Sequence, residues 1–232
     1  MRIVFQIPVK ARTSARVPNK NFRDLNGRPL FAWLIDEILK LKLRELEFDI
    51  FVDSEDISAF ENITGYYCGE KRIQFHQRDP WLAEDHANGN HLLAHFAVHK
   101  PTYDIYIQAF ITAVTLRREI IGASIKSFTQ NLNNHDSMFL VTEEPGWVWY
   151  QGKAVNYDPT RMAGLPRSQD AMYFKETTGL YAITKDALMQ GGCRIGNTPM
   201  LYAVDRFSSV DIDTMEDLHE AEEILGREAR LR

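Results

Sequence analysis

A cluster of cations follows an apolar segment at the start of the chain. The segment Ile3–Ile7 leads into Pro8, and the next residues form a short polar stretch that carries four basic side chains, Lys10, Arg12, Arg16 and Lys20. Backbone N–H groups and ammonium charges that converge in a loop after a strand can hold a polyphosphate. The same composition also suits a solvated surface turn, so the loop alone leaves both interpretations open.

Two carboxylates near the other end of the chain, Asp211 and Asp213, flank the apolar Ile212. We expect the segment 209–214 to close the last strand, which would place both carboxylates on one face while Ile212 packs behind. Carboxylates on one face repel each other unless a cation lies nearby. Mg²⁺ suits this pair because it prefers oxygen ligands and is often held by one or two carboxylates plus substrate phosphates. In the alternative interpretation, Asp213 caps the next helix and Asp211 is solvated.

The basic loop and the acidic pair are complementary parts of one polyphosphate reaction. Their cooperation requires the two ends of the chain to meet, so we expect Lys20 and Asp213 to share a cleft. The residues Thr214–Asp217 resemble a capping box that starts the final helix and fixes the position of the acidic pair.

Strands and helices alternate along the rest of the chain. Apolar runs rich in β-branched and aromatic residues predict strands at 3–7, 48–52, 73–75, 103–108, 138–141, 179–183 and 200–204. Helical periodicity predicts helices at 29–41, 89–99, 117–128, 185–189 and 215–225. This alternation favours βαβ units in a mostly parallel sheet, in which ligands bind at the carboxyl ends of the strands.

The segment 143–170 differs, because aromatic residues alternate there with Gly, Pro and polar residues and no helical period appears. Exposed aromatic groups of this kind are typical of an interface arm. A β-hairpin packed on its own domain is the alternative.

Composition bounds the class of protein. The chain has 232 residues, of which 44% are hydrophobic and 25% charged, and its net charge of −5 disfavours nucleic-acid binding. No apolar run reaches the roughly 20 residues of a membrane span, and no signal-peptide pattern is present, so we expect a cytoplasmic protein that does not bind membranes. Cys68 and Cys193 form neither a disulfide framework nor a metal-ligand spacing, and we expect both to pack in the interior.

Three histidines fall at helical spacing, at His91, His95 and His99. This pattern could indicate a zinc site, but that helix holds no Glu or Cys to complete the ligand set, so we expect a solvated or packing stripe. Neither Gly-x-Gly-x-x-Gly after the first strand nor Gly-Lys-Ser/Thr occurs, which disfavours a dinucleotide dehydrogenase and a P-loop kinase.

Taken in order, the motifs resemble the acylneuraminate cytidylyltransferase (CMP-sialic acid synthetase) family over nearly the whole chain. The segments that carry the resemblance are 12–21, 53–57, 78–85, 108–114, 166–170, 177–181 and 209–217. The resemblance implies an α/β fold of three layers, Rossmann-like, with a mostly parallel mixed sheet. Residues 1–232 would form a single cytidylyltransferase domain, with 143–170 a dimerisation or substrate arm of a homodimer.

The resemblance also implies a reaction, in which a 2-keto sugar acid attacks CTP to give a CMP-sugar and pyrophosphate. The implied catalytic residues are Asp211, Lys20 and Arg12. Implied nucleotide contacts are Arg12, Ser14, Lys20, Asn21, Arg78 and Asn88. The implied sugar contacts are Gln108, Arg167, Thr177 and Tyr181, and Asp211 with Asp213 would bind Mg²⁺. As alternatives to these roles, Gln108 could be a buried polar residue, Tyr181 a core aromatic residue and Arg167 a surface ion pair.

Three residues depart from the family pattern, namely Ala15 for Lys, Val114 for Pro and Thr177 for Asn. Lys10 or Arg16 could replace the charge missing at Ala15. These departures suggest a second hypothesis, a non-catalytic nucleotide-binding relative. A third is a cytidylyltransferase for 3-deoxy-manno-octulosonate, which uses the same chemistry.

Overall fold

Seven strands form one central sheet in the part of the chain that the computed structural model describes, which is residues 1–11, 17–43 and 46–231. In sheet order the strands are β11 (Pro199–Val204), β7 (Ser137–Pro145), β10 (Met172–Thr184), β6 (Ile105–Ala109), β1 (Arg2–Pro8), β4 (Glu47–Ser54) and β5 (Ile73–Gln77). Strand β10 runs antiparallel to β6 and β7, and the other neighbours pair in parallel. The predicted mostly parallel mixed sheet is therefore confirmed.

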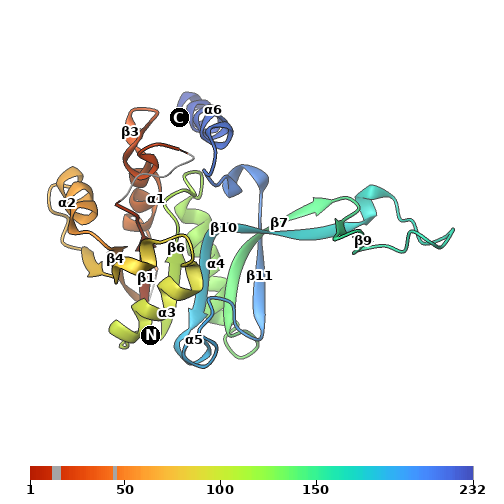
Figure 1. Cartoon of the computed structure of the whole chain (residues 1–232), viewed down its shortest axis with the longest axis horizontal. Helices are drawn as coiled ribbons and strands as arrows, with labels where there is room; N and C mark the ends of the chain where they lie inside the picture. The colour runs from red at the N-terminus through yellow and green to blue at the C-terminus, as the bar shows by residue number, and fades with distance from the viewer. Residues whose placement is uncertain (12–16, 44–45, 232) are drawn as a thin grey trace.

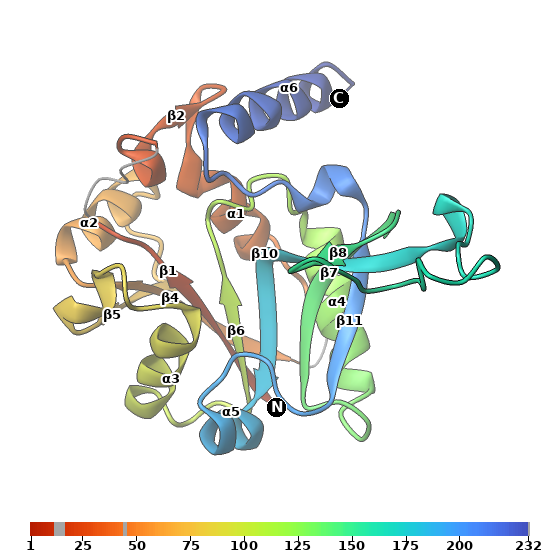
Figure 2. The same ribbon diagram turned by 45° about the vertical axis from the view of Figure 1, so that its right-hand side comes forward.

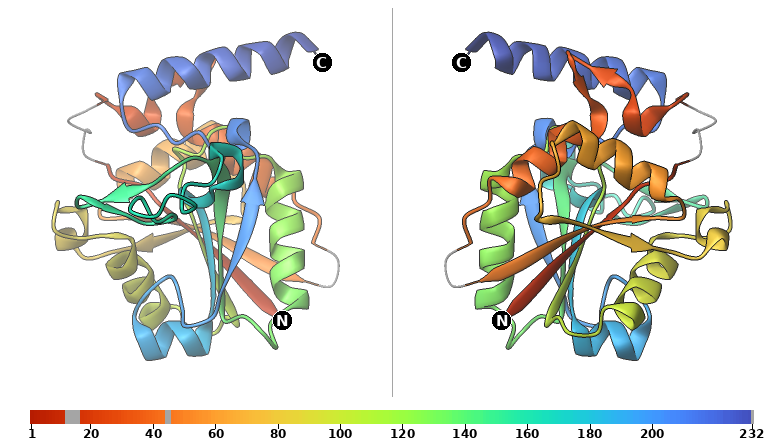
Figure 3. Two further views of the ribbon diagram at one scale, coloured as in Figure 1. Left: turned by 90° about the vertical axis from the view of Figure 1, so that its right-hand side faces the viewer. Right: turned by 90° about the vertical axis from the view of Figure 1, so that its left-hand side faces the viewer.

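Helices cover both faces of the sheet, so the fold has three layers (Figure 3). One core cluster joins the sheet to α1 (Leu30–Leu39), α2 (Ile57–Tyr66), α4 (Arg118–Gln130) and α6 (Met215–Leu231). The other joins it to α3 (Gly89–His99) and α5 (Lys185–Gly191). Strand β1 is covered on both sides, which explains its nearly continuous apolar sequence, and Ile3, Val4, Phe5 and Ile7 are fully buried.

A segment from the first thirty residues lies beside the last helix, although the two termini themselves lie at opposite sides of the molecule (Figure 2). The hairpin of β2 (Asp24–Leu25) and β3 (Arg28–Pro29) follows the 3-10 helix η1 (Lys20–Phe22), and α6 runs beside it (Figure 2). The side-chain amide of Asn26 at the hairpin turn donates a hydrogen bond of 2.9 Å to the carbonyl of Glu222 in α6. Among the described helices, none has the length and apolar character that crossing a membrane requires.

An arm, residues 143–170, extends away from the sheet between β7 and β10 (Figure 1). It contains the short hairpin of β8 (Trp149–Tyr150) and β9 (Lys153–Ala154) and the 3-10 helix η3 (Ser168–Asp170). Trp147, Trp149 and Tyr150 are about half exposed or more. The arm is thus not a hairpin packed on its own domain.

One prediction about the interior is wrong. Cys68 and Cys193 are both exposed, so neither packs in the core. Cys68 has a left-handed φ of 52° in the turn that follows α2, and this turn lies at the surface.

Candidate active site

A cavity of about 660 Å³ opens beside the carboxyl ends of β1 and β6 and is lined by residues from both ends of the chain. Pro8 and Lys10 contribute from the loop after β1, Ile111 and Thr112 from the loop after β6, and Asp213 from the segment before α6. The carboxyl edge of parallel strands is where ligands bind in open α/β sheets. A larger cavity of about 1200 Å³ lies along α4 and the end of α1, away from this edge.

Lys20 and Asp213 meet in the cavity. The Lys20 Nζ donates hydrogen bonds to the Ile212 carbonyl at 2.7 Å and to Asp213 Oδ1 at 3.1 Å. The Lys20 side chain is only 14% exposed, whereas that of Asp213 is 48% exposed. The prediction that the two ends of the chain share a cleft is confirmed.

The acidic pair does not lie on a strand, contrary to our prediction. Strand β11 ends at Val204, the 3-10 helix η4 (Arg206–Ser209) follows, and the residues from Val210 to Thr214 form no regular element. Ile212 nevertheless packs in the core, and its N–H donates to the carbonyl of Thr112 at 3.2 Å. This anchor leaves Asp211 and Asp213 on either side of Ile212, where both line the cavity.

Asp211 has one oxygen that is engaged and one that is not. Its Oδ2 accepts a short hydrogen bond from the hydroxyl of Thr178, whereas its Oδ1 is buried and has no hydrogen-bond partner among the described residues. An unpaired buried carboxylate oxygen is costly, and its presence in a cavity favours a cationic ligand. A second carboxylate nearby completes the kind of oxygen donor set that Mg²⁺ prefers, so the residues present fit the predicted ion.

The predicted capping box fixes the segment that carries the acidic pair. Asp217 Oδ2 accepts hydrogen bonds from the N–H groups of Asp213 and Thr214, at 2.9 and 2.7 Å, and Thr214 Oγ1 in turn accepts from the Asp217 N–H at 3.2 Å. Partial burial opposes ionisation of Asp217, but these hydrogen bonds outweigh it and hold the pKa of its carboxyl below the ordinary value.

Part of the basic loop can be described. The predicted residues Arg12 and Ser14 lie outside the described residues, as do Ala15 and Arg16. Asn21 lines the cavity and donates from Nδ2 to the carbonyl of Lys10 at 2.8 Å, which holds the loop. Lys10 also lines the cavity, so it is placed to supply the charge missing at Ala15.

Arg78 lines the cavity but is almost wholly buried and largely paired. Its guanidinium donates to Glu55 Oε2 at 2.8 Å and to the carbonyl of Asp53 at 3.1 Å, while its Nε has no hydrogen-bond partner among the described residues. Glu55 Oε1 accepts from the Ala11 N–H at 3.0 Å, so this ion pair ties the strand end to the basic loop.

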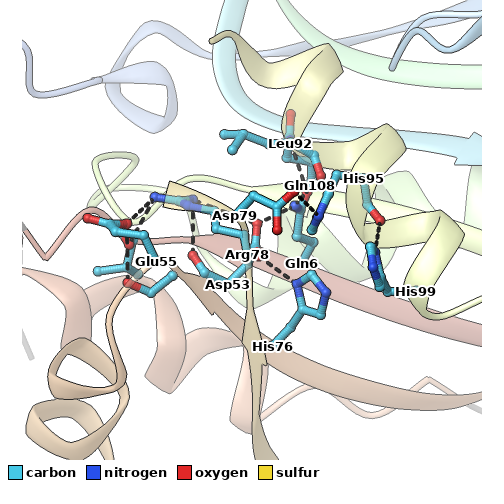
Figure 4. A network of polar contacts seen from close by, with 12 residues as sticks. Gln6, Asp53, Glu55, His76, Arg78, Asp79, Leu92, His95, His99 and Gln108 are labelled. Carbon is cyan, nitrogen blue, oxygen red and sulfur yellow. Dashed lines mark hydrogen bonds and ion pairs between the residues drawn. The ribbon is translucent and has the colours of Figure 1, made fainter. Parts of the chain in front are cut away.

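Asn88 and Gln108 form hydrogen bonds with other groups of the protein. Asn88 caps α3, and its Oδ1 accepts from the N–H of Asn90 at 3.0 Å and of His91 at 3.3 Å. Gln108 is fully buried, and its Nε2 donates to Gln6 Oε1 at 2.8 Å and to the Gly89 carbonyl at 3.0 Å (Figure 4). Neither residue lines the cavity, and their predicted ligand contacts stay predictions.

Thr177 and Tyr181 belong to the irregular part of β10, where the pairing with β7 shifts register between Glu176 and Tyr181. Thr177 Oγ1 donates to the Leu140 carbonyl at 3.1 Å. The fully buried Tyr181 donates its hydroxyl to Glu176, and burial, reinforced by that carboxylate, raises the pKa of Tyr181. Thr177 lines a neighbouring cavity of about 430 Å³. Asp211 lines both this cavity and the 660 Å³ cavity.

Arg167 lies in the arm and contributes nothing to either cavity. Its exposed guanidinium forms a two-point ion pair with Asp170, with N···O distances of 2.7 and 3.2 Å. The local geometry is that of a surface ion pair, and the predicted sugar contact of Arg167 stays a prediction.

Sequence reasoning missed Arg194, which lines the cavity from the loop between α5 and β11. Its guanidinium carbon lies 3.7 Å from the centre of the Tyr181 ring, and Nη2 lies 3.6 Å from Glu176 Oε1. A Cβ at Gly89 would collide with Arg194 Nη1, so the missing side chain there makes room for this cation. No sequence motif marks Arg194, because only the folded chain brings its loop over Tyr181.

Comparison with known proteins identifies the family. A cytidylyltransferase family model matches residues 7–230. A search of curated proteins gives no match. The chain is similar in structure to a CMP:2-keto-3-deoxy-manno-octonic acid synthetase complexed with CTP, with a TM-score of 0.67 at 16% identity, covering 98% of this chain and 100% of that one.

Two further solved structures share the fold. The bifunctional IspDF from Campylobacter jejuni gives a TM-score of 0.64 at 12% identity and covers 95% of this chain and 54% of that one. The 4-diphosphocytidyl-2C-methyl-D-erythritol synthase from Anaerococcus prevotii gives a TM-score of 0.62 at 12% identity and covers 97% of this chain and 96% of that one. The TM-scores show that these proteins share the fold, and the family model spans almost the whole sequence. The chain therefore belongs to the cytidylyltransferase family of nucleotidyltransferases that use CTP.

Proposed function

We propose that this protein activates a 2-keto sugar acid, an N-acylneuraminate or a related nonulosonic acid, with CTP. The anomeric C2 hydroxyl oxygen forms a bond to the α-phosphorus, the bond from that phosphorus to the bridging β-phosphate oxygen breaks, and pyrophosphate leaves with the bonding electrons. The products are the CMP-sugar and pyrophosphate.

The single observation that carries this proposal is the contact between Lys20 and Asp213 at the cavity. It brings together a cation from the start of the chain, which suits a triphosphate, and carboxylates from near its end, which suit the metal ion that accompanies a triphosphate. Lys20 uses two of its three N–H donors on Ile212 and Asp213 among the described residues, which fixes its position. Its positive charge stabilises the negative charge that develops on the leaving pyrophosphate.

Asp211 and Asp213 are the residues that would hold Mg²⁺, because they line the same cavity and Oδ1 of Asp211 has no partner there. When bound, the ion lowers the repulsion between the nucleophile and the α-phosphate. We assign the proton that the attacking hydroxyl loses to the carboxylate of Asp211. Thr178 orients this carboxylate through its hydrogen bond to Oδ2.

Arg194 is our candidate for the carboxylate of the sugar acid. Its guanidinium has only long polar contacts with the described residues, with Glu176 at 3.6 Å and with Gln108 Oε1 at 3.4 Å, and it packs on the Tyr181 ring. A planar guanidinium can bind a carboxylate through two hydrogen bonds. Arg167 would fill this role only if the arm reached the cavity of a second subunit.

The fold is compatible with more than one acceptor. The structure that resembles this chain with 16% identity is a synthetase of CMP:2-keto-3-deoxy-manno-octonic acid, so an octulosonate is the second candidate substrate. A synthase of 4-diphosphocytidyl-2C-methyl-D-erythritol shares the fold as well, so the acceptor must be determined by experiment.

The test is pyrophosphate release from CTP and Mg²⁺ with each member of a panel. The panel contains N-acetylneuraminate, other nonulosonic acids, 3-deoxy-manno-octulosonate and 2C-methyl-D-erythritol 4-phosphate. We expect release with a nonulosonic acid; release only with the octulosonate would select the second candidate. Turnover of the erythritol phosphate alone would overturn the proposal, and CTP binding without turnover of any acid would favour a non-catalytic relative.

We also propose that the arm forms a homodimer interface. Trp149, Tyr150 and Phe174 are each more than half exposed on the arm and on the strand beside it, and aromatic residues of this kind are enriched at interfaces. Sedimentation of the full chain at micromolar concentration should give a dimer. A monomeric mass would contradict this.

A further inference from the structure

Three histidines from two elements converge on the face of the sheet that α3 covers. His76 comes from β5, and His95 and His99 come from consecutive turns of α3. One ring nitrogen of each lies within 4.8 Å of those of the other two. The sequence stripe suggested His91 as the third member, but His91 instead completes the capping box of α3, and His76 takes that place.

Hydrogen bonds fix the tautomers of two of these rings. Nδ1 of His76 lies 2.7 Å from Asp53 Oδ1, and Nδ1 of His99 lies 2.9 Å from the carbonyl of His95 (Figure 4). Carboxylates and carbonyls accept hydrogen bonds, so each Nδ1 carries a proton and Nε2 is the nitrogen left to bind a metal ion. The pairing of His76 with a carboxylate is the arrangement that orients histidine ligands in metal sites.

His95 supplies a different observation, because both of its ring nitrogens are buried without a hydrogen-bond partner among the described residues. Its nearest carboxylate oxygen is Asp79 Oδ2, 3.6 Å from Nε2, which is too long for a hydrogen bond. Burial, and then the nearby His99, lowers the pKa of His95, which agrees with its lack of a hydrogen-bond partner in the described part of the chain. A buried imidazole without partners in a cluster of imidazoles needs an explanation.

We propose that His76, His95 and His99 bind a divalent transition-metal ion of the zinc type, and that Asp53 positions His76. The ion is not the one that the acidic pair of the active site would hold. Imidazole nitrogens suit zinc, whereas Mg²⁺ prefers oxygen ligands. The exposed side of the cluster at His99 leaves a fourth position for solvent or for Asp79.

The ring positions agree with such a site after small rotations of the three side chains. At a tetrahedral zinc ion two ligand nitrogens lie roughly 3.4 Å apart and two imidazole centres roughly 5 Å apart. The ring centres of His76 lie 5.5 Å from His95 and 5.6 Å from His99, and those of His95 and His99 lie 4.3 Å apart. Ring rotations that bring the nitrogens closer by up to about 1.4 Å, and that move the His95 and His99 rings slightly apart, therefore complete the site.

The ion would join α3 to β5 and stiffen a network that reaches the cavity. Asp53 Oδ2 accepts from Gln6 Nε2 at 2.6 Å, and the Asp53 carbonyl accepts from Arg78, which lines the cavity. An ion bound to His76 would thus hold a partner of Asp53 in place, and Asp53 in turn contacts Arg78 at the cavity.

The test uses the untagged full chain, freed of metal by a chelator and titrated calorimetrically with Zn²⁺ alone near pH 7.5. We expect one ion per chain with a dissociation constant in the micromolar range or below, and a rise of a few degrees in the unfolding midpoint. Replacement by Co²⁺ should give the intense visible absorption of a tetrahedral site. Absence of stoichiometric Zn²⁺ binding would overturn the proposal.

Variants locate the ion. His99→Ala removes the most exposed ligand, so the chain should stay folded while Zn²⁺ binding weakens at least about 100-fold. His91→Gln is the matched control on the same helix, because Gln keeps the capping box, and its binding should equal wild type. Asp211→Asn should also leave the binding unchanged. Zn²⁺ binding that survives His99→Ala, or that is lost in either control, would place the ion elsewhere and refute the assignment.

Discussion

Two polar regions lie close to each other in this fold and differ in how their groups are paired. In the network behind α3, Asp53 receives contacts from Gln6, His76 and Arg78. Gln108 donates to Gln6 and Gly89, and its Oε1 accepts from Arg194 at 3.4 Å. In the cavity, Asp211 keeps a buried oxygen without a partner among the described residues. Asp53 and Gln6 in the first region use their hydrogen bonds within the fold, whereas Asp211 in the second keeps an oxygen available for a ligand.

This difference separates residues that position from residues that bind. Gln108 is a predicted sugar contact that is fully buried in the network and reaches the cavity lining through its contacts with Gly89 and Arg194. Asp211 and Lys20 lie in the cavity, as their predicted roles require. Substitutions in the network should therefore lower stability first, and substitutions in the cavity should lower the rate first.

Asp211→Asn should have the largest effect, a loss of kcat on the order of 10³-fold, because it removes the charge that the metal and the attacking hydroxyl both require. Steady-state pyrophosphate release measures it, and the unfolding midpoint should stay close to that of wild type. Thr178→Val keeps the acid and removes only its hydrogen bond, so a loss of about 10-fold is expected. A wild-type rate for Asp211→Asn would disprove the metal assignment.

Asp53→Asn tests the other region. It leaves the buried Arg78 with less compensating charge, so unfolding in urea should show a loss of about 3 kcal/mol. Asp49→Asn is the matched control on the same strand, where the exposed ion pair with Arg2 at 3.3 Å predicts a loss below about 1 kcal/mol. Equal losses for the two variants would erase the distinction between the regions.

Lys20→Met should lower kcat/KM about 100-fold, because the charge opposite the leaving pyrophosphate is lost while the methylene packing remains. Initial rates measured over a range of CTP concentrations give kcat/KM for the variant and for wild type. Lys10→Met, at an exposed position of the same cavity, should cost less than about 10-fold. A larger effect at Lys10 would show that the phosphates bind nearer to that residue.

Asp217→Ala should have the smallest effect, a loss of about 1 kcal/mol from the missing helix cap, measured by urea unfolding at neutral pH. Because the folded pKa of Asp217 lies below its ordinary value of 3.8, its contribution is present above that value and lost as the pH falls through the folded pKa. The difference between wild type and variant should thus vanish in strong acid. A difference that persists there would mean that the cap does not depend on charge.

Much of the fold could be predicted from the sequence, because each strand of the sheet contains a short run rich in apolar residues and each predicted run lies largely within one observed strand. Helix α2 escaped prediction, since only Ala59 and Ile63 are buried along it and its apolar stripe is weak. The strand predicted at Asp211 failed because a packed Ile212, rather than sheet pairing, sets the direction of the two acids.

The candidate site was predictable where a local motif marked it and not where only tertiary structure assembles it. Lys20 and Asp213 lie in recognisable segments, so their meeting could be predicted from complementary charge. Arg194 lies in a loop without a motif, and His76 joins His95 only when β5 packs beside α3. No spacing along the sequence encodes such contacts.

The ion pair between Lys20 and Asp213 has a consequence for synthesis of the chain. Since Asp211 and Asp213 line the cavity, a nascent polypeptide cannot complete the cavity wall beside Lys20 until these residues have left the ribosome. A chain truncated before residue 211 would therefore lack the acidic half of this charge pattern while keeping Lys20.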